Sequence, residues 1–176
     1  MFFGTNRSLQ RVNLDKHLFL NNNPIELVQK FKYLGIILDS ELNYDKYISD
    51  IRKKVGFRIT QLSRIRKYIN SEQALNIYKT KVLPFFDYGD VLYHGSAVQN
   101  TDKLRRLQNR ALKVCLMKGR LTSTNLIHKE AKINFLEERR IPHVLKLSFK
   151  KAQKQENLQT KVRNTRHNEG PLLKYI

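Results

Sequence analysis

The sequence offers one pair of carboxylates whose spacing could serve metal-dependent chemistry, Asp87 and Asp90 in the segment FDYGD. Phosphoryl transfer with two metal ions needs acidic side chains that lie close enough to share those ions. A turn would place both carboxylates on one side of the chain. Asp is also favoured in turns because its side chain bonds to the nearby backbone, and we favour this structural interpretation. We therefore expect no catalytic residue, no metal ligand and no cofactor in this chain.

The other reactive side chains do not form a recognisable site. The single cysteine, Cys115, lies beside the apolar stripe of a predicted helix and is expected to be a small buried hydrophobe. One sulfur atom forms neither an internal disulfide nor a thiolate zinc site, and the five histidines are scattered along the chain. No phosphate-binding loop or nucleophile elbow occurs. This cysteine usage fits a reducing, intracellular setting, and leaves nucleus or cytoplasm open.

Positive charge is the outstanding property of the sequence. Its 176 residues hold 34 Lys and Arg against 15 Asp and Glu, which gives a net charge of +19. Such a charge indicates partners rather than a fold, and nucleic acid is a better candidate than an anionic membrane. The alternative is a soluble protein that happens to be basic. The longest nearly continuous apolar run, Tyr33 to Leu38, is too short to span a bilayer.

The basic residues gather on two predicted helices. On the later helix, one stripe lies to the side of the apolar positions and consists of Lys103, Arg106, Arg110 and Lys113. On the earlier helix, Lys53, Lys54 and Arg64 belong to a surface with few acidic partners one turn away. The ordinary interpretation of such a surface is a solvated helix face. A face without counter-charges is better explained by an external polyanion, and the absence of a base-reading motif predicts contacts to phosphate, independent of sequence.

The first third of the chain predicts short strands that form a small antiparallel sheet. The expected strands are Met1 to Phe3, His17 to Leu20, Ile25 to Val28 and Phe31 to Leu38, with a turn at Asn21 to Pro24. After Ser40 the apolar period becomes helical. One face of a helix that runs to about residue 68 carries Tyr44, Ile48, Ile51, Val55, Ile59 and Leu62.

Further helices are expected downstream. They begin at Ser71, Thr101, Thr122 and Phe135, and the last of them ends near Gln153. The apolar stripe of the helix after Thr101 is predicted to be Leu104, Leu107, Ala111 and Val114. The fold class is therefore α+β and mostly α, with a short antiparallel β element followed by a helical bundle. The expected divisions are a β element at 1–40, a helical part at 41–153 and a basic, loosely ordered tail at 154–176.

Five segments, in order, resemble the reverse transcriptases of non-LTR retrotransposons of the LINE-like, jockey and CR1 type. FKYLGIILDSELNYDKYI is similar to the family's YLG strand pair and the first thumb helix after it. The later segments are LNIYKTKVLPFFDYGDVLYHG, KLRRLQNRALKVCL, STNLIHKEAKINFLEERR and NTRHNEG. MFFG resembles the last palm strand, which implies that the chain starts just after the metal-binding carboxylates. Tyr44 and Tyr47 stand where the family usually has Trp and His, and both keep a packing role.

The resemblance implies a fragment of an RNA-directed DNA polymerase. It implies the end of the palm and a primer-grip-like element at 1–40, with a thumb and its C-terminal extension at 41–153. Lys32, Tyr33 and Gly35 match the primer-grip segment and are implied to lie at the primer strand. The family's Mg²⁺ is bound upstream, so the chain alone is expected to have no catalytic activity. The implied partner is an RNA/DNA template–primer duplex, with no membrane partner, and the oligomeric state stays undetermined.

Two other interpretations stay open. The chain could be a non-functional transposon relic or scaffold piece with no independent activity, because an uncovered strand edge invites aggregation. It could also be a polymerase subunit that borrows its carboxylates from another chain.

Overall fold

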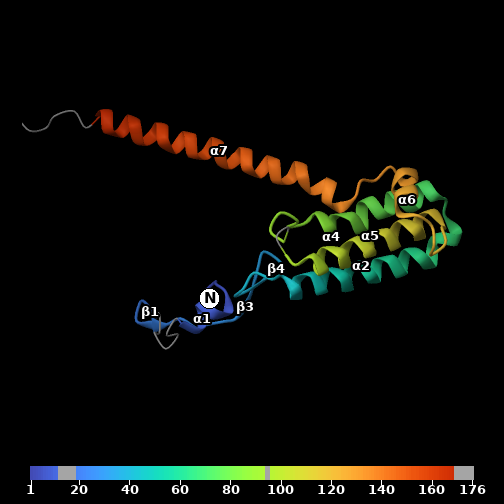
Figure 1. Ribbon diagram of the computed structural model, residues 1–176, viewed down its shortest axis with the longest axis horizontal. Coiled ribbons are helices and arrows are strands. Elements are labelled where there is room, and N and C mark those ends of the chain that lie inside the picture. Colours follow the sequence, from blue (N-terminus) through green and yellow to red (C-terminus); the bar gives the residue numbers. More distant parts are fainter. Residues whose placement is uncertain (12–18, 94–95, 169–176) are drawn as a thin grey trace, which may run out of the picture. The chain divides into compact units, whose positions relative to one another are not determined.

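The computed structural model describes residues 1–11, 19–93 and 96–168. The chain forms two compact units, Met1–Leu136 and Glu137–Ile176. The first unit contains the β elements and most of the helices, and the second consists largely of one long helix (Figure 1). This arrangement confirms the predicted fold class. The boundaries predicted after residues 40 and 153 differ from this division and stay a prediction.

The N-terminal part contains one short helix and two small antiparallel sheets. These elements are α1 (Asn6–Arg11), β1 (Phe19–Leu20), β2 (Asn23–Pro24), β3 (Lys30–Tyr33) and β4 (Ile36–Asp39). β1 pairs with β2, and β3 pairs with β4. The predictions of strands at 1–3 and 25–28 are wrong, because among the described residues neither segment has a partner strand that would complete a ladder. Of the strand predicted at 17–20, the first two residues lie outside the described ranges.

The strand predicted from Phe31 to Leu38 is in fact a hairpin. Its turn is formed by Leu34 (φ 47°) and Gly35 (φ 81°), and Tyr33 pairs with Ile36 across it. Positive φ at both turn residues matches the twist of the flanking strands. Glycine adopts this conformation without strain, so Gly35 serves as a turn residue rather than as an interruption within a strand.

Asp39 holds the joint between β4 and helix α2 (Asp45–Ile65). Its two carboxylate oxygens accept hydrogen bonds from the backbone N–H groups of Asn43 (2.8 Å) and Tyr44 (2.9 Å). Leu42 and Tyr44 both have positive φ, which L-residues seldom adopt. The carboxylate therefore stabilises a turn whose backbone is otherwise unfavourable, and it fixes where the first long helix begins.

We expect Asp39→Ala to lower the free energy of unfolding by about 1–2 kcal/mol, as for the loss of a helix N-terminal cap. Urea denaturation followed by circular dichroism measures this change. Asp39→Asn keeps one carbonyl oxygen and should lose less. The control is Glu41→Ala, because Glu41 is an exposed carboxylate in the same turn that accepts only from the side chain of Asn43. Equal effects at the two positions would rule out the capping role.

The remaining elements form the helical part. They are η1 (Arg66–Tyr68), α3 (Ser71–Ile77), the π-helical segment η2 (Tyr78–Val82), α4 (Leu83–Asp87), α5 (Val98–Leu116), α6 (Thr124–Ala131) and α7 (Leu136–Asn168). α2 and α5 are the long helices of the first unit and pack side by side (Figure 1). The segment from η1 to α4 connects them and also contributes to the core.

α2 and α5 run in the same direction. Near their first residues, Nδ2 of Asn100 donates to Oδ1 of Asp45 at 2.6 Å. Near their last residues, Nε of Arg66 donates to the carbonyl oxygen of Cys115 at 2.8 Å. Because each contact joins corresponding ends, the two helices are parallel, and the segment between them returns the chain to the starting end.

The core confirms one predicted apolar face and corrects another. All six predicted positions on and just before α2, from Tyr44 to Leu62, are buried. On α5, Leu104 and Ala111 are buried as predicted, whereas Leu107 and Val114 are only partly buried. The fully buried residues of α5 that the prediction missed are Gln108 and Leu112, whereas Cys115 is buried as expected. α5 packs against α2, α3 and α6 at once, so its buried surface is wider than a single stripe.

The helix α7 continues past Gln153, near which the sequence predicted its end. Pro142 lies inside it without ending it, and residues 154–168 are helical where a loosely ordered tail was expected. These residues contain no Gly or Pro, the two residue types that disfavour a helix most. Residues 169–176 of the predicted tail lie outside the described ranges. In the part that the structure describes, no helix has the length and apolar character needed to cross a membrane.

Candidate nucleic-acid interface

The segment FDYGD fastens the β3–β4 hairpin to the helices. The hydroxyl of Tyr88 donates to the carbonyl oxygen of Leu34 in the hairpin turn, and the hydroxyl of Tyr47 donates to the carbonyl oxygen of Tyr88 at 2.9 Å. Gly89 has φ 70°, and a Cβ there would lie 2.8 Å from Cδ1 of Ile36. The chain therefore passes close to β4, which only a residue without a side chain permits.

The two carboxylates of FDYGD are part of this structural turn. The backbone N–H of Asp90 donates to the carbonyl oxygen of Asp87, and Asp90 is buried. Across residues 1–11, 19–93 and 96–168, no three His, Cys, Asp or Glu side chains are grouped so as to hold a metal ion. The turn interpretation agrees with this geometry, and the expectation of no metal and no catalysis stays a prediction.

Cys115 is buried, as predicted. Its Sγ lies 3.6 Å from the carbonyl oxygen of Ala74 as a hydrogen-bond donor. Burial raises the pKa of the Cys115 thiol to about 12, although the nearby Arg66 guanidinium lowers it in part. The thiol is therefore protonated at neutral pH, which agrees with the packing role that the sequence predicts for Cys115.

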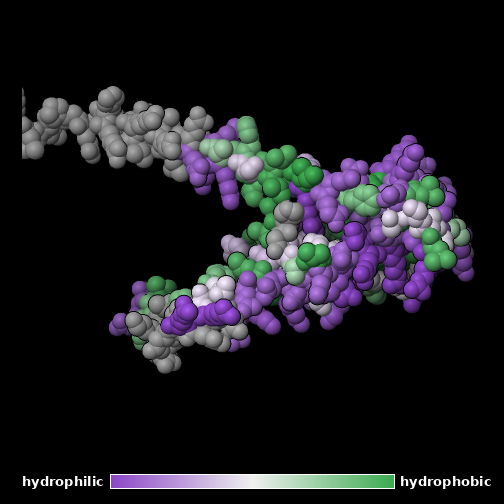
Figure 2. All heavy atoms as spheres, in the orientation of Figure 1, coloured by the Kyte–Doolittle hydropathy of each residue, from purple (hydrophilic) through white to green (hydrophobic). Residues whose placement is uncertain are grey.

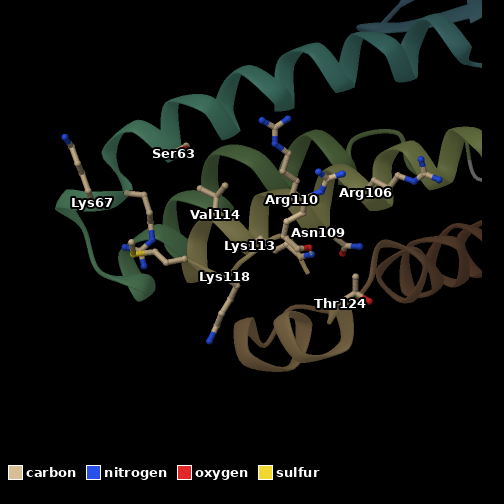
Figure 3. A pocket seen from close by; sticks show the side chains of 12 residues that line it. Ser63, Lys67, Arg106, Asn109, Arg110, Lys113, Val114, Lys118 and Thr124 are labelled. Carbon is tan, nitrogen blue, oxygen red and sulfur yellow. Dashed lines mark hydrogen bonds between the residues drawn. The ribbon is translucent and has the colours of Figure 1, made fainter. Parts of the chain in front are cut away.

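A cavity of about 900 Å³ opens between the last turns of α2 and α5 and the first turn of α6 (Figure 3). We call it the cationic groove, and it is lined by Ser63, Arg66, Lys67, Arg106, Asn109, Arg110, Lys113, Val114, Met117, Lys118, Arg120 and Thr124. Seven of these twelve residues are Lys or Arg, and none is acidic. A concave surface lined by charge of one sign focuses the field and concentrates the opposite ion, here an anion.

Few of these positive charges are neutralised by neighbouring side chains. Nζ of Lys118 lies 3.0 Å from Oε2 of Glu130. Within the described ranges, the side chains of Arg106, Arg110 and Arg120 have no hydrogen-bond or ion-pair partner. Hydrophilic residues also dominate the visible surface over α2 and α5 (Figure 2). Three guanidinium groups are therefore available to an external anion.

Arg66 forms part of the base of the cationic groove and has a structural role. It is buried, and its guanidinium donates to the carbonyl oxygens of Cys115 and Ile69 and to Oγ of Ser71 (2.7 Å). The carbonyl of Cys115 is among the last of α5, where no further turn of helix supplies a donor. Arg66 thus caps α5 from a neighbouring element.

His128 of α6 fixes the position of the Asn109 side chain, which lines the cationic groove. Nε2 of His128 is hydrogen-bonded to Oδ1 of Asn109 at 2.8 Å, and Nδ1 is hydrogen-bonded to the carbonyl oxygen of Ile133 at 2.8 Å. The imidazole ring also stacks on Phe135. One edge of the Asn109 amide is therefore fixed by the protein, and the other edge is left to the groove.

The ten predicted nucleic-acid-binding residues are divided among several places. Arg106, Arg110 and Lys113 come together in the cationic groove. Gly35 and Lys54 line a second cavity of about 430 Å³, which also includes the aromatic residues Tyr47, Phe85 and Tyr88.

The remaining five predicted residues line neither cavity. Lys32, Tyr33, Lys53 and Arg64 are exposed on the hairpin and on α2. Nζ of Lys103 donates to Oδ1 of Asn100 at 3.0 Å and so supports the contact between the starts of α2 and α5.

The sequence did not predict seven polar or charged residues of the groove, which are Ser63, Arg66, Lys67, Asn109, Lys118, Arg120 and Thr124. Lys67 and Arg120 come from a short turn and a loop, where no helical period marks a face. Asn109 lies beside the predicted basic stripe, but its partner His128 is on another helix. A count of basic residues between helices would have singled out Lys118 and Arg120, and nothing in the sequence would have joined them to Lys67.

Similarity to known proteins is limited to a few curated relatives. No protein-family model and no solved structure matches the chain. Over 97 residues, it is 31% identical to the RNA-directed DNA polymerase from mobile element jockey of Drosophila melanogaster and 28% identical to that of Drosophila funebris. Over 119 residues, it is 21% identical to the probable RNA-directed DNA polymerase from transposon X-element of Drosophila melanogaster.

These matches are partial for both partners. They cover 53% of this chain for the two jockey proteins and 66% for the X-element protein, but only 11% to 13% of the relatives' own lengths. The chain therefore has a distant, partial similarity to RNA-directed DNA polymerases of non-LTR retrotransposons. The predicted resemblance is confirmed at that level, and its assignment to the primer grip and thumb stays a prediction.

Proposed function

We propose that this chain is part of a non-LTR retrotransposon reverse transcriptase and that it binds template–primer nucleic acid through the phosphate backbone. The observation that carries this proposal is the cationic groove, with seven basic residues, no acidic residue and three unpartnered arginines among the described side chains. The similarity to RNA-directed DNA polymerases supplies the class of polyanion. Backbone binding follows because lysine and arginine on helix surfaces recognise phosphate charge rather than base identity.

We assign the β elements at 1–40 to the end of the palm and the primer grip, and the helices from 41 to the thumb and its extension. The hairpin supports this assignment, because Lys32 and Tyr33 are exposed residues of a hairpin that Tyr88 and Gly89 attach to the helices. A fastened hairpin presents a cation and an aromatic ring at a fixed position beside α2. Polymerisation itself requires carboxylates from outside this chain.

Salt dependence tests the proposal directly. The probe is a fluorescent RNA/DNA template–primer with a single-stranded overhang, titrated by anisotropy between 50 and 200 mM NaCl. For six to ten phosphate contacts, the logarithm of the association constant should fall against the logarithm of salt with a slope of about −5 to −9. Unrelated sequences should bind with the same affinity within about threefold. A flat salt response, or strong preference for one sequence, would refute backbone binding.

A second candidate is a piece with no independent activity, which the exposed apolar residues of the β elements favour. Phe19, Leu20, Phe31 and Leu34 are each more than half exposed. Where exposed apolar side chains form one continuous patch, the patch often marks a surface that another protein covers. Insolubility of the isolated chain, cured by co-expression with the remainder of a related polymerase, would favour this candidate over the first.

A further inference from the structure

We infer that the cationic groove holds a single strand of nucleic acid, as a site separate from the contacts that the chain makes with a duplex. This inference rests on the proposed function and names the form of nucleic acid that enters the groove. Duplex contacts would then be made by the predicted residues outside the groove, which are Lys32, Lys53, Lys54, Arg64 and Lys103.

The groove is concave and is enclosed from three sides. Ser63 at the end of α2 and Lys67 of η1 line one side of the groove, residues of α5 form its floor, and Lys118 and Thr124 line the side of α6 (Figure 3). A volume of about 900 Å³ lies in the range of clefts that enclose most of a bound molecule. A duplex presents a wide convex surface and rests on the rims of such a cleft, whereas one strand fits between its walls.

The length of the floor suits a short strand. Lining residues of α5 extend from Arg106 to Lys113 and Val114, and the lining continues to Met117 just after the helix. At about 1.5 Å per residue this distance is about 17 Å, which leaves room for a few nucleotides of an unpaired strand. A strand of this length would bring several phosphates within reach of the three unpartnered arginines.

The lining also suits the other parts of a nucleotide. Ser63, Asn109 and Thr124 offer hydroxyl and amide groups that can bond to sugar hydroxyls, and the position of the Asn109 amide is fixed by His128. Val114 and Met117 provide apolar surface against which a sugar or an unstacked base can lie. Positive charge combined with such surface is typical of sites for single strands.

The test compares three probes at 0.1 M salt, an eight-nucleotide RNA, the same sequence as DNA, and a blunt RNA/DNA duplex. The variant is Lys67→Ala with Arg120→Ala, because both residues are exposed and lie in the groove but outside the predicted duplex contacts. Each lost phosphate contact to a single strand reduces the association constant by about 0.7 logarithmic units at this salt, so affinity for both eight-nucleotide probes should fall about 25-fold. Duplex affinity should change less than threefold.

The matched control is Lys79→Ala with Lys81→Ala, which removes two exposed lysines of η2 that line neither cavity. It should change the affinity for every probe less than threefold. An equal loss for strand and duplex in the groove variant, or no loss for the strand, would overturn the inference. If the unaltered chain binds the duplex but neither eight-nucleotide probe, the inference fails and the proposed function stands. If it binds no probe, the proposed function itself fails.

Discussion

Replacing Lys103, Arg106, Arg110 and Lys113 together by alanine is expected to weaken binding of a template–primer with an overhang by about 10³-fold at 0.1 M salt. Each phosphate contact contributes about 0.7 to 0.9 logarithmic units to the association constant at this salt, and four contacts contribute about three. Three of the four residues share the cationic groove, and the fourth lies one turn before them on α5. Anisotropy titrations give the affinities, and the slope against salt should become less steep by about three.

The loss should be the same for unrelated sequences, because these side chains meet phosphates and not bases. The control removes the same charge from exposed positions outside both cavities by combining Lys79→Ala, Lys81→Ala, Arg105→Ala and Lys129→Ala. This variant should lose less than tenfold. Equal losses in the two variants would show that net charge, and not the groove, governs binding. Circular dichroism establishes that both variants are folded.

Arg66→Ala is expected to lower the free energy of unfolding by about 3 kcal/mol, which corresponds to a melting temperature lower by about 6–12 °C. The substitution leaves the buried carbonyl oxygen of Cys115 without its donor, together with the partly buried carbonyl oxygen of Ile69 and hydroxyl of Ser71. Buried acceptors that lose a charged donor are costly because water does not replace it. Urea denaturation measures the change.

Two further variants at this end of α2 separate capping from charge. Arg64→Ala removes the same charge from an exposed position two residues earlier and should change stability by less than about 0.5 kcal/mol. Arg66→Lys keeps the charge but cannot reach three acceptors at once, so its effect should be intermediate. A similar small effect at residues 64 and 66 would contradict the capping role of Arg66.

The part of the fold that sequence predicted best is α2, because its apolar face repeats over five turns toward one side. The β3–β4 hairpin was harder to predict from the sequence. Leu34 is apolar and so continues the strand pattern of Phe31 to Leu38, yet it adopts positive φ and starts a turn. The face of α5 was only half predicted, since a helix with neighbours on three sides buries Gln108 and Leu112 along with its expected stripe.

The residues of the cationic groove show the same limit of prediction from sequence. Arg106, Arg110 and Lys113 could be predicted as neighbours because helix geometry alone places them on one side. Lys67 and Arg120 join them only after the chain between η1 and α5 has folded back. The contact of Tyr88 with Leu34 likewise depends on tertiary structure, because the two residues are 54 positions apart in the sequence. No local sequence pattern predicts it.

The parallel direction of α2 and α5 affects the electrostatic repulsion between the basic side chains of the cationic groove. Both helices end beside the cationic groove, and the aligned peptide dipoles of a helix place roughly half a negative charge at its C-terminus. The two ends together supply about one unit of built-in counter-charge where seven basic side chains meet, and the positive N-terminus of the short helix α6, which also borders the groove, offsets part of it. Antiparallel helices would have brought one positive end there and increased the mutual repulsion of the cations. The contacts of Asn100 and Arg66 therefore fix the direction of both helix dipoles as well as the packing, and this direction lowers the mutual repulsion of the cations in the groove.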